Sequence, residues 1–196
     1  MTTKNKSLSL AFIPLAIGIN LGIGAIVQVL KLPVFLDSIG TIIAALILGW
    51  RAGAIVGILS FAISTITIFP PSIYFSGTQL CIAIYICFIG KKGLFSSFGK
   101  VFASGAMLSV ITALASAPVI YYLFGGVTGN GIGIFTIYLE GIGLPKANAV
   151  LISGFSAELI DKIAQCLIAF YILKSIPKFL LSKFNSIPLQ KNGFTD

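Results

Sequence analysis

The sequence predicts an all-α fold, an integral membrane bundle of six transmembrane helices with both termini cytoplasmic. Of its 196 residues, 57% are hydrophobic and 9% are charged, whereas a soluble domain carries roughly 25% charged residues. Mean hydropathy is +1.07. Apolar runs recur along the chain between prolines, glycines and basic residues. A helical span needs about 20 apolar residues, so six spans leave only short loops and tails and no room for a soluble catalytic domain.

We expect a single transmembrane domain over residues 1–196, with a tail at 1–7, the bundle at 8–175 and a second tail at 176–196. The first apolar run is long for a signal peptide and lacks a clear cleavage site, so it is interpreted as a retained helix. Breaking residues mark the span ends. The predicted spans are Leu8–Leu30, Asp37–Gly49, Ala54–Phe69, Ser76–Ile89, Val101–Phe124 and Ala147–Leu173.

Two regions of this plan are irregular. The second span has only about 13 residues, so it is expected to be tilted or to cross only part of the bilayer. Residues Trp50–Gly53 are predicted to form a tight basic turn that separates it from the third span. Residues 125–146, rich in glycine, are expected to connect the last two spans.

Orientation follows from the distribution of lysine and arginine, because cytoplasmic loops carry an excess of both. Only Lys31 and Lys146 fall in the expected outer loops. The expected inner segments hold Lys4, Lys6, Arg51, Lys91, Lys92, Lys100, Lys174, Lys178, Lys183 and Lys191. This bias requires an even number of spans and places both termini in the cytoplasm. The net charge of +8 is therefore attributed to membrane topology and not to nucleic-acid binding.

The composition also limits the chemistry that we expect. There is no histidine, which removes the commonest metal ligand and acid–base residue. The sequence contains no P-loop, HExxH or GxSxG motif. Cys81, Cys87 and Cys166 lie in apolar runs without a CxxC pair and are interpreted as small buried hydrophobes. We predict no enzyme activity, cofactor or metal site.

The last span contains three ionisable residues, Glu158, Asp161 and Lys162, and such residues are costly within a membrane. Glu158 and Lys162 are four residues apart and are expected to pair, as are Asp161 and Gln165. A helical stripe of Leu151, Gly154, Glu158, Asp161 and Gln165 is expected to face the interior. Two interpretations stay open: a functional polar pocket or coupling contact, and a structural ion pair.

Polar residues from several spans are predicted to meet near the outer surface. Asp37 and Ser38 begin the second span, where helix capping is an alternative explanation. For the tyrosines the alternative is an interfacial belt. Convergent polar groups in an apolar setting are typical of a ligand site. The predicted substrate-binding residues are Gln28, Asp37, Ser38, Tyr74, Gln79, Tyr121, Asn148 and Glu158.

Small residues in the first span permit close helix–helix approach. Ala16, Gly18 and Gly22 are the candidates for docking of another subunit, with internal packing as the alternative.

Three segments and one residue pair resemble the S components of energy-coupling factor (ECF) transporters. They are Leu32–Thr41, Ala45–Gly57, Phe124–Gly129 and the pair Asp161–Lys162. The resemblance implies a six-helix subunit that binds a vitamin or related micronutrient from outside. It also implies a site closed by the loops at 31–36 and 70–75. The implied partners are membrane lipid, a transmembrane coupling subunit and two cytoplasmic ATPase subunits that supply the energy for uptake.

The resemblance leaves the vitamin-like substrate open. An ion-coupled secondary transporter that uses Glu158 and Asp161 is the main alternative, although such folds usually show internal repeats and more spans. A membrane enzyme and a scaffold without ligand are further alternatives.

Overall fold

The chain is all-helical over the residues that the computed structural model describes, which are 3–126, 131–177, 179, 181 and 184. The sequence-predicted basic residues Lys178, Lys183 and Lys191, and Thr128 and Gly129 of the ECF-like motif, lie outside this range. Seven α-helices and one 3₁₀ helix follow one another in the described chain. They are α1 (Thr3–Val29), α2 (Ile39–Leu48), α3 (Trp50–Thr67), η1 (Pro70–Phe75), α4 (Ser76–Lys91), α5 (Phe98–Leu123), α6 (Gly131–Gly141) and α7 (Lys146–Ser175).

Four segments are long and apolar enough to cross a membrane, which is compatible with a membrane protein. They are Leu10–Val29, Trp50–Thr67, Pro70–Lys91 and Phe98–Leu123. Helix α7 has 30 residues but carries three charges near its middle. The surface is apolar in the way that a lipid-facing surface requires, with Val29 80% and Ile66 87% exposed.

Helix α2 forms the centre of the bundle. All residues from Ile39 to Ile47 are buried, in contact with α1, α3, α4 and α7. Its sequence is apolar on every side, as expected of a helix with no face toward water. With 10 residues, or about 15 Å, it is too short to cross the bilayer alone.

The prediction that α2 and α3 are separate helices is confirmed, but the predicted turn was misplaced. The chain reverses at Gly49, whose φ of 96° suits glycine. Trp50 and Arg51 belong to the first turn of α3 instead of a connecting loop. The single glycine is therefore enough to separate the two helices.

The expectation of a purely connecting stretch over 125–146 was wrong, because this stretch contains α6. Glycine disfavours helix in isolation, yet α6 packs on α7. The hydroxyls of Thr136 and Ser153 are 2.7 Å apart across that contact. Tertiary packing overrides the local preference here.

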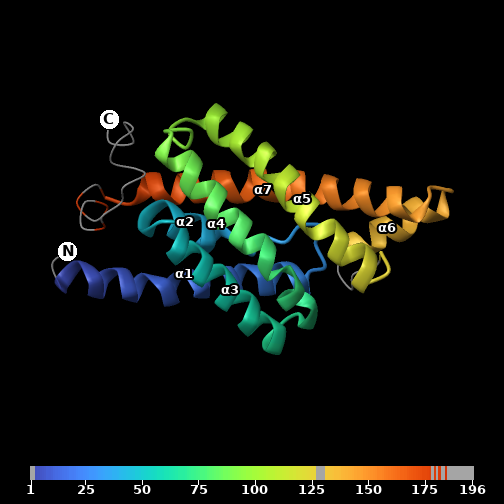
Figure 1. The fold of residues 1–196 in the computed structure, drawn as a ribbon, viewed down its shortest axis with the longest axis horizontal. Coiled ribbons are helices and arrows are strands. Elements are labelled where there is room, and N and C mark those ends of the chain that lie inside the picture. Colours follow the sequence, from blue (N-terminus) through green and yellow to red (C-terminus); the bar gives the residue numbers. More distant parts are fainter. Residues whose placement is uncertain (1–2, 127–130, 178, 180, 182–183, 185–196) are drawn as a thin grey trace.

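The predicted inner segments lie at one end of the molecule. In Figure 1 the start of α1, the α2–α3 junction, the α4–α5 connection and the end of α7 all lie toward the left. Beyond α7, Phe184 is buried and its ring lies 5.6 Å from that of Phe12 in α1. The second tail thus contributes at least one side chain to the core.

Candidate functional site

The cavity that contains charged groups, called the main cavity below, lies between the loop before α2 and the helices α3, η1, α4, α5, α6 and α7. A larger cavity of about 220 Å³ between α5 and α7 is lined almost entirely by apolar residues. The main cavity has a volume of about 60 Å³, which is room for roughly four to six water molecules. The charged groups in its lining are Asp37, Glu158 and Lys162. The remaining lining residues are Phe35, Ser38, Phe61, Phe69, Ser72, Phe75, Thr78, Gln79, Ser116, Ile120, Ile132 and Gly154.

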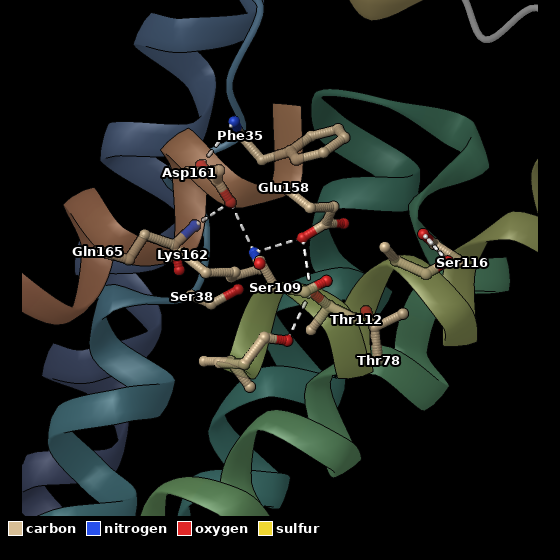
Figure 2. Close-up of polar contacts among 12 residues, drawn as sticks. Phe35, Ser38, Thr78, Ser109, Thr112, Ser116, Glu158, Asp161, Lys162 and Gln165 are labelled. Carbon is tan, nitrogen blue, oxygen red and sulfur yellow. Dashed lines mark hydrogen bonds and ion pairs between the residues drawn. The ribbon is translucent and has the colours of Figure 1, made fainter. Parts of the chain in front are cut away.

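Helix α7 supplies a buried charge cluster to this cavity (Figure 2). Lys162 Nζ lies 2.6 Å from Asp161 Oδ2 and 3.5 Å from Glu158 Oε2. All three side chains are buried. The predicted Glu158–Lys162 pair is therefore confirmed, but Asp161 is the nearer partner of the ammonium.

Asp161 fastens the loop before α2 to α7. Its Oδ1 accepts hydrogen bonds from the backbone N–H groups of Phe35 at 2.9 Å and Leu36 at 2.8 Å. Two successive amides converge on one oxygen because Leu36 adopts a positive φ of 48°. Its Oδ2 accepts from Lys162 and, at 2.7 Å, from Gln165 Nε2. Four donors thus occupy this carboxylate.

Glu158 is only partly satisfied. Its Oε2 accepts a 2.7 Å hydrogen bond from Thr112 Oγ1 of α5 and faces Lys162. Among the described residues, none donates to Oε1, which points away from Lys162 in Figure 2. The residue is 6% exposed and lines the cavity. One oxygen of this buried side chain therefore has no protein donor among the described residues and is available to a ligand.

A chain of hydrogen bonds from α1 ends on Asp37. Asn20 Nδ2 donates to Thr41 Oγ1 at 3.0 Å, and Thr41 donates to Gln79 Oε1 at 2.8 Å. Gln79 Nε2 then donates to Ser38 Oγ at 2.7 Å, and Ser38 donates to Asp37 Oδ1 at 2.8 Å. Every donor in this chain is directed toward the carboxyl group of Asp37, which accepts the last hydrogen bond.

The structure brings together half of the predicted binding residues. Asp37, Ser38, Gln79 and Glu158 line the main cavity. Gln28 lines an adjoining cavity of about 50 Å³, which also includes Asp37. The two cavities share Phe35, Asp37, Phe61, Phe69 and Ser72.

The other three predicted binding residues lie elsewhere. Tyr74 and Tyr121 are exposed, and their rings pack on Phe124 at 5.8 Å and Tyr122 at 5.1 Å. Asn148 is also exposed, near the start of α7. None of the three lines the cavity that contains Glu158, because their helices are rotated so that these side chains face outward. The sequence does not reveal that rotation.

Two other predictions about helix faces need correction. Ala16 is buried against Ala44 and Val56, so internal packing explains it and it offers no docking surface. Gly18 and Gly22 lie on the outside, with open space where a side chain would extend. Leu151, expected in the inward stripe, is 51% exposed.

Sequence reasoning missed the aromatic wall of the cavity and the role of Asn20. Phe35, Phe61, Phe69 and Phe75 line the cavity, but phenylalanine is too common in membrane helices to be informative. Asn20 gave a usable signal, because it is the one polar side chain in the apolar stretch of α1 between Leu10 and Val27. Its Oδ1 also accepts from Gly40 N at 2.7 Å, so it joins α1 to α2.

The described residues contain no group of three or more His, Cys, Asp or Glu side chains placed to hold a metal ion. Cys87 and Cys166 are buried as expected, and Cys81 is half-buried. Comparison with family models gave no match. Searches of curated proteins and of solved structures gave none either. The function is therefore argued from the residues and their geometry.

Proposed function

We propose that this chain captures a small molecule in the cavity beside Glu158, as the substrate-binding subunit of an ECF-type importer. The observation that carries this proposal is a buried cavity with one free carboxylate oxygen, lined by six helices and a loop. A mostly apolar cavity with a few convergent polar groups is the usual form of a ligand site. The chain's own chemistry would be binding, and partner subunits would supply ATP.

The transport role rests on the resemblance to S components and on topology. The loops implied to close the site, 31–36 and 70–75, both contribute to the cavity through Phe35, Ser72 and Phe75. We expect α1, α3, α4, α5 and α7 to cross, and α2 together with the loop before it to provide a sixth passage. That even number keeps both termini on the cytoplasmic side. The cavity has room for roughly four to six water molecules, and we expect these loops to move when a vitamin-sized molecule enters.

The alternative is an ion-coupled transporter that uses Glu158 and Asp161, and the bonding of Asp161 leaves Glu158 as its carrier candidate. A carboxylate that cycles through proton or ion binding needs a free oxygen, whereas Asp161 accepts four hydrogen bonds. The two mechanisms differ in vesicles that contain this chain alone. Our proposal expects binding without accumulation there, and ion-driven accumulation would contradict it.

Ligand capture is tested on the protein purified from membranes. Mass spectrometry should detect a small molecule that copurifies with the wild-type chain. Asp37→Ala and Gln79→Ala should lower the retained amount, on the order of tenfold each, because each removes a polar group from the cavity or its support. Glu140→Ala, outside the cavities described above, is the acidic control. Full retention in both cavity variants would exclude this site.

Coupling to partners is tested at Gly18 and Gly22, which lie on the open face of α1. If that face docks against the coupling subunit, Gly18→Leu and Gly22→Leu should reduce uptake at least about tenfold in cells by preventing close approach. Ligand retention by the purified variants should stay at the wild-type level, because neither glycine lines a cavity described here. Unchanged uptake in both variants would assign docking to another face.

A further inference from the structure

The main cavity contains more acidic than basic groups. Asp37, Glu158 and Asp161 bring three carboxylates to the region, and Lys162 brings one ammonium. With every group ionised the sum is −3 + 1, or −2. Among the residues that line the cavity, Lys162 is the one cation. A buried charge excess of this kind is costly, and it is relieved either when a carboxyl takes up a proton or when a cation binds.

The one ammonium is already committed to its neighbours. Lys162 Nζ lies 2.6 Å from Asp161 and 3.5 Å from Glu158, so Asp161 alone suffices to neutralise it. Glu158 Oε1 then remains without a donor among the described residues, and Asp37 accepts a hydrogen bond from Ser38 but has no cation of its own. Both acids line the same cavity. Glu158 holds its free oxygen there while being 6% exposed.

The walls of the cavity are suited to a cation with an apolar body. Four phenylalanines line it: Phe35, Phe61, Phe69 and Phe75. Lys162 Nζ lies 5.9 Å from the centroid of the Phe35 ring, so that ring already faces a positive charge. The faces of aromatic rings attract cations electrostatically, more strongly away from water. A metal ion would instead require several oxygen ligands, and the described residues hold no such group.

We infer that the ligand of this cavity is an organic cation, a protonated amine or quaternary nitrogen attached to an aromatic or compact apolar group. This inference rests on the proposed function, because it assigns a charge to the molecule that the cavity captures. The positive nitrogen would lie between Glu158 Oε1 and Asp37, and the apolar part would pack against the phenylalanines. Asp161 and Lys162 would fix the position of Glu158 without contacting the ligand.

The inference is tested with three probes of similar size and different charge: benzylammonium, benzyl alcohol and benzoate. Binding to the purified chain is titrated at neutral pH by ligand-observed NMR. Benzylammonium should bind at least about tenfold more tightly than benzyl alcohol, because a hydrogen bond to a charged group is the stronger kind. Benzoate should bind most weakly. The inference would be overturned if benzyl alcohol or benzoate bound as tightly as benzylammonium, or more tightly.

Variants locate the charge preference. Glu158→Gln and Asp37→Asn should each lower benzylammonium affinity on the order of tenfold and leave benzyl alcohol unchanged, because each keeps the shape and removes a charge. Glu140→Gln is the matched control and should change neither. Thermal melting identifies any variant that fails to fold. Unfolding is detected by the reaction of the buried Cys87 and Cys166 thiols with a fluorogenic maleimide. An unchanged preference in both folded variants would place the cation elsewhere and overturn the inference.

Native mass spectrometry separates this inference from the proposed function. A retained adduct with a fixed or protonated nitrogen supports both. A neutral or anionic adduct would overturn the cation inference and leave ligand capture in place. If no adduct is retained and none of the three probes binds, both proposals fall.

Discussion

Asp161→Asn should destabilise the protein by about 3–5 kcal/mol, because removing one partner of a buried ion pair leaves an uncompensated charge. The carboxylate has two acceptor oxygens, and the amide has only one. The lost oxygen can no longer accept its share of the four hydrogen bonds from Phe35, Leu36, Lys162 and Gln165. For a chain of this length the melting temperature should fall by at least about 6 °C. The melting temperature is measured by the reaction of the buried cysteines with the fluorogenic maleimide.

A double variant separates the lost charge from the lost hydrogen bonds. In Asp161→Asn the ammonium of Lys162 loses its closest partner. Lys162→Met removes that ammonium, so the double variant should be more stable than Asp161→Asn alone. Glu140→Gln, an acid-to-amide change elsewhere in the chain, should shift the melting temperature little. If Asp161→Asn and the double variant melt at the wild-type temperature, the buried pair contributes no stability and our account of this cluster is wrong.

Gly40→Ala should be comparably damaging, although it adds a single methyl group. A Cβ at this position would overlap the backbone carbonyl of Ala16 and lie 3.0 Å from Asn20 Oδ1. Backbone cannot move aside as a flexible side chain does, so α1 and α2 must separate. We expect a loss of about 3 kcal/mol, at the upper end of the usual cost of overpacking, again measured by thermal melting.

Gly18→Ala is the matched control for Gly40→Ala, because it makes the same chemical change at the same level of α1 but on its outer face, away from the α1–α2 contact. Nothing lies within 4 Å of a Cβ built at Gly18. In a helix interior, alanine is favoured over glycine by about 1 kcal/mol, so this variant should melt at or above the wild-type temperature. Equal melting of the two alanine variants would show that α1 and α2 do not approach as closely as described.

The charge cluster and the separation of α2 from α3 could be predicted from the sequence because their signals are local. Glu158 and Lys162 meet through helical spacing alone, and Gly49 marks a chain reversal on its own. The cavity could be predicted only in part. Asp37, Ser38 and Gln79 were found because polar residues are rare in this chain.

The remaining features depend on contacts between distant segments. Helix α6 forms despite its glycines because it packs on α7, and no local pattern encodes that contact. The phenylalanine wall depends on how α3 and η1 are rotated about their axes. Tyr74, Tyr121 and Asn148 were expected at the site but are exposed, since the sequence does not fix which side of its helix a polar residue faces.

The attachment of the loop before α2 to Asp161 has a kinetic consequence. That side of the cavity is held by hydrogen bonds to a carboxylate, which are roughly twice as strong as neutral ones. On the opposite side, η1 is joined to α3 by a neutral contact between Ser64 and Ser72 at 3.0 Å. Exchange with the outside should therefore proceed past η1, and the residence time of a bound molecule should shorten when Ser72 loses its hydroxyl.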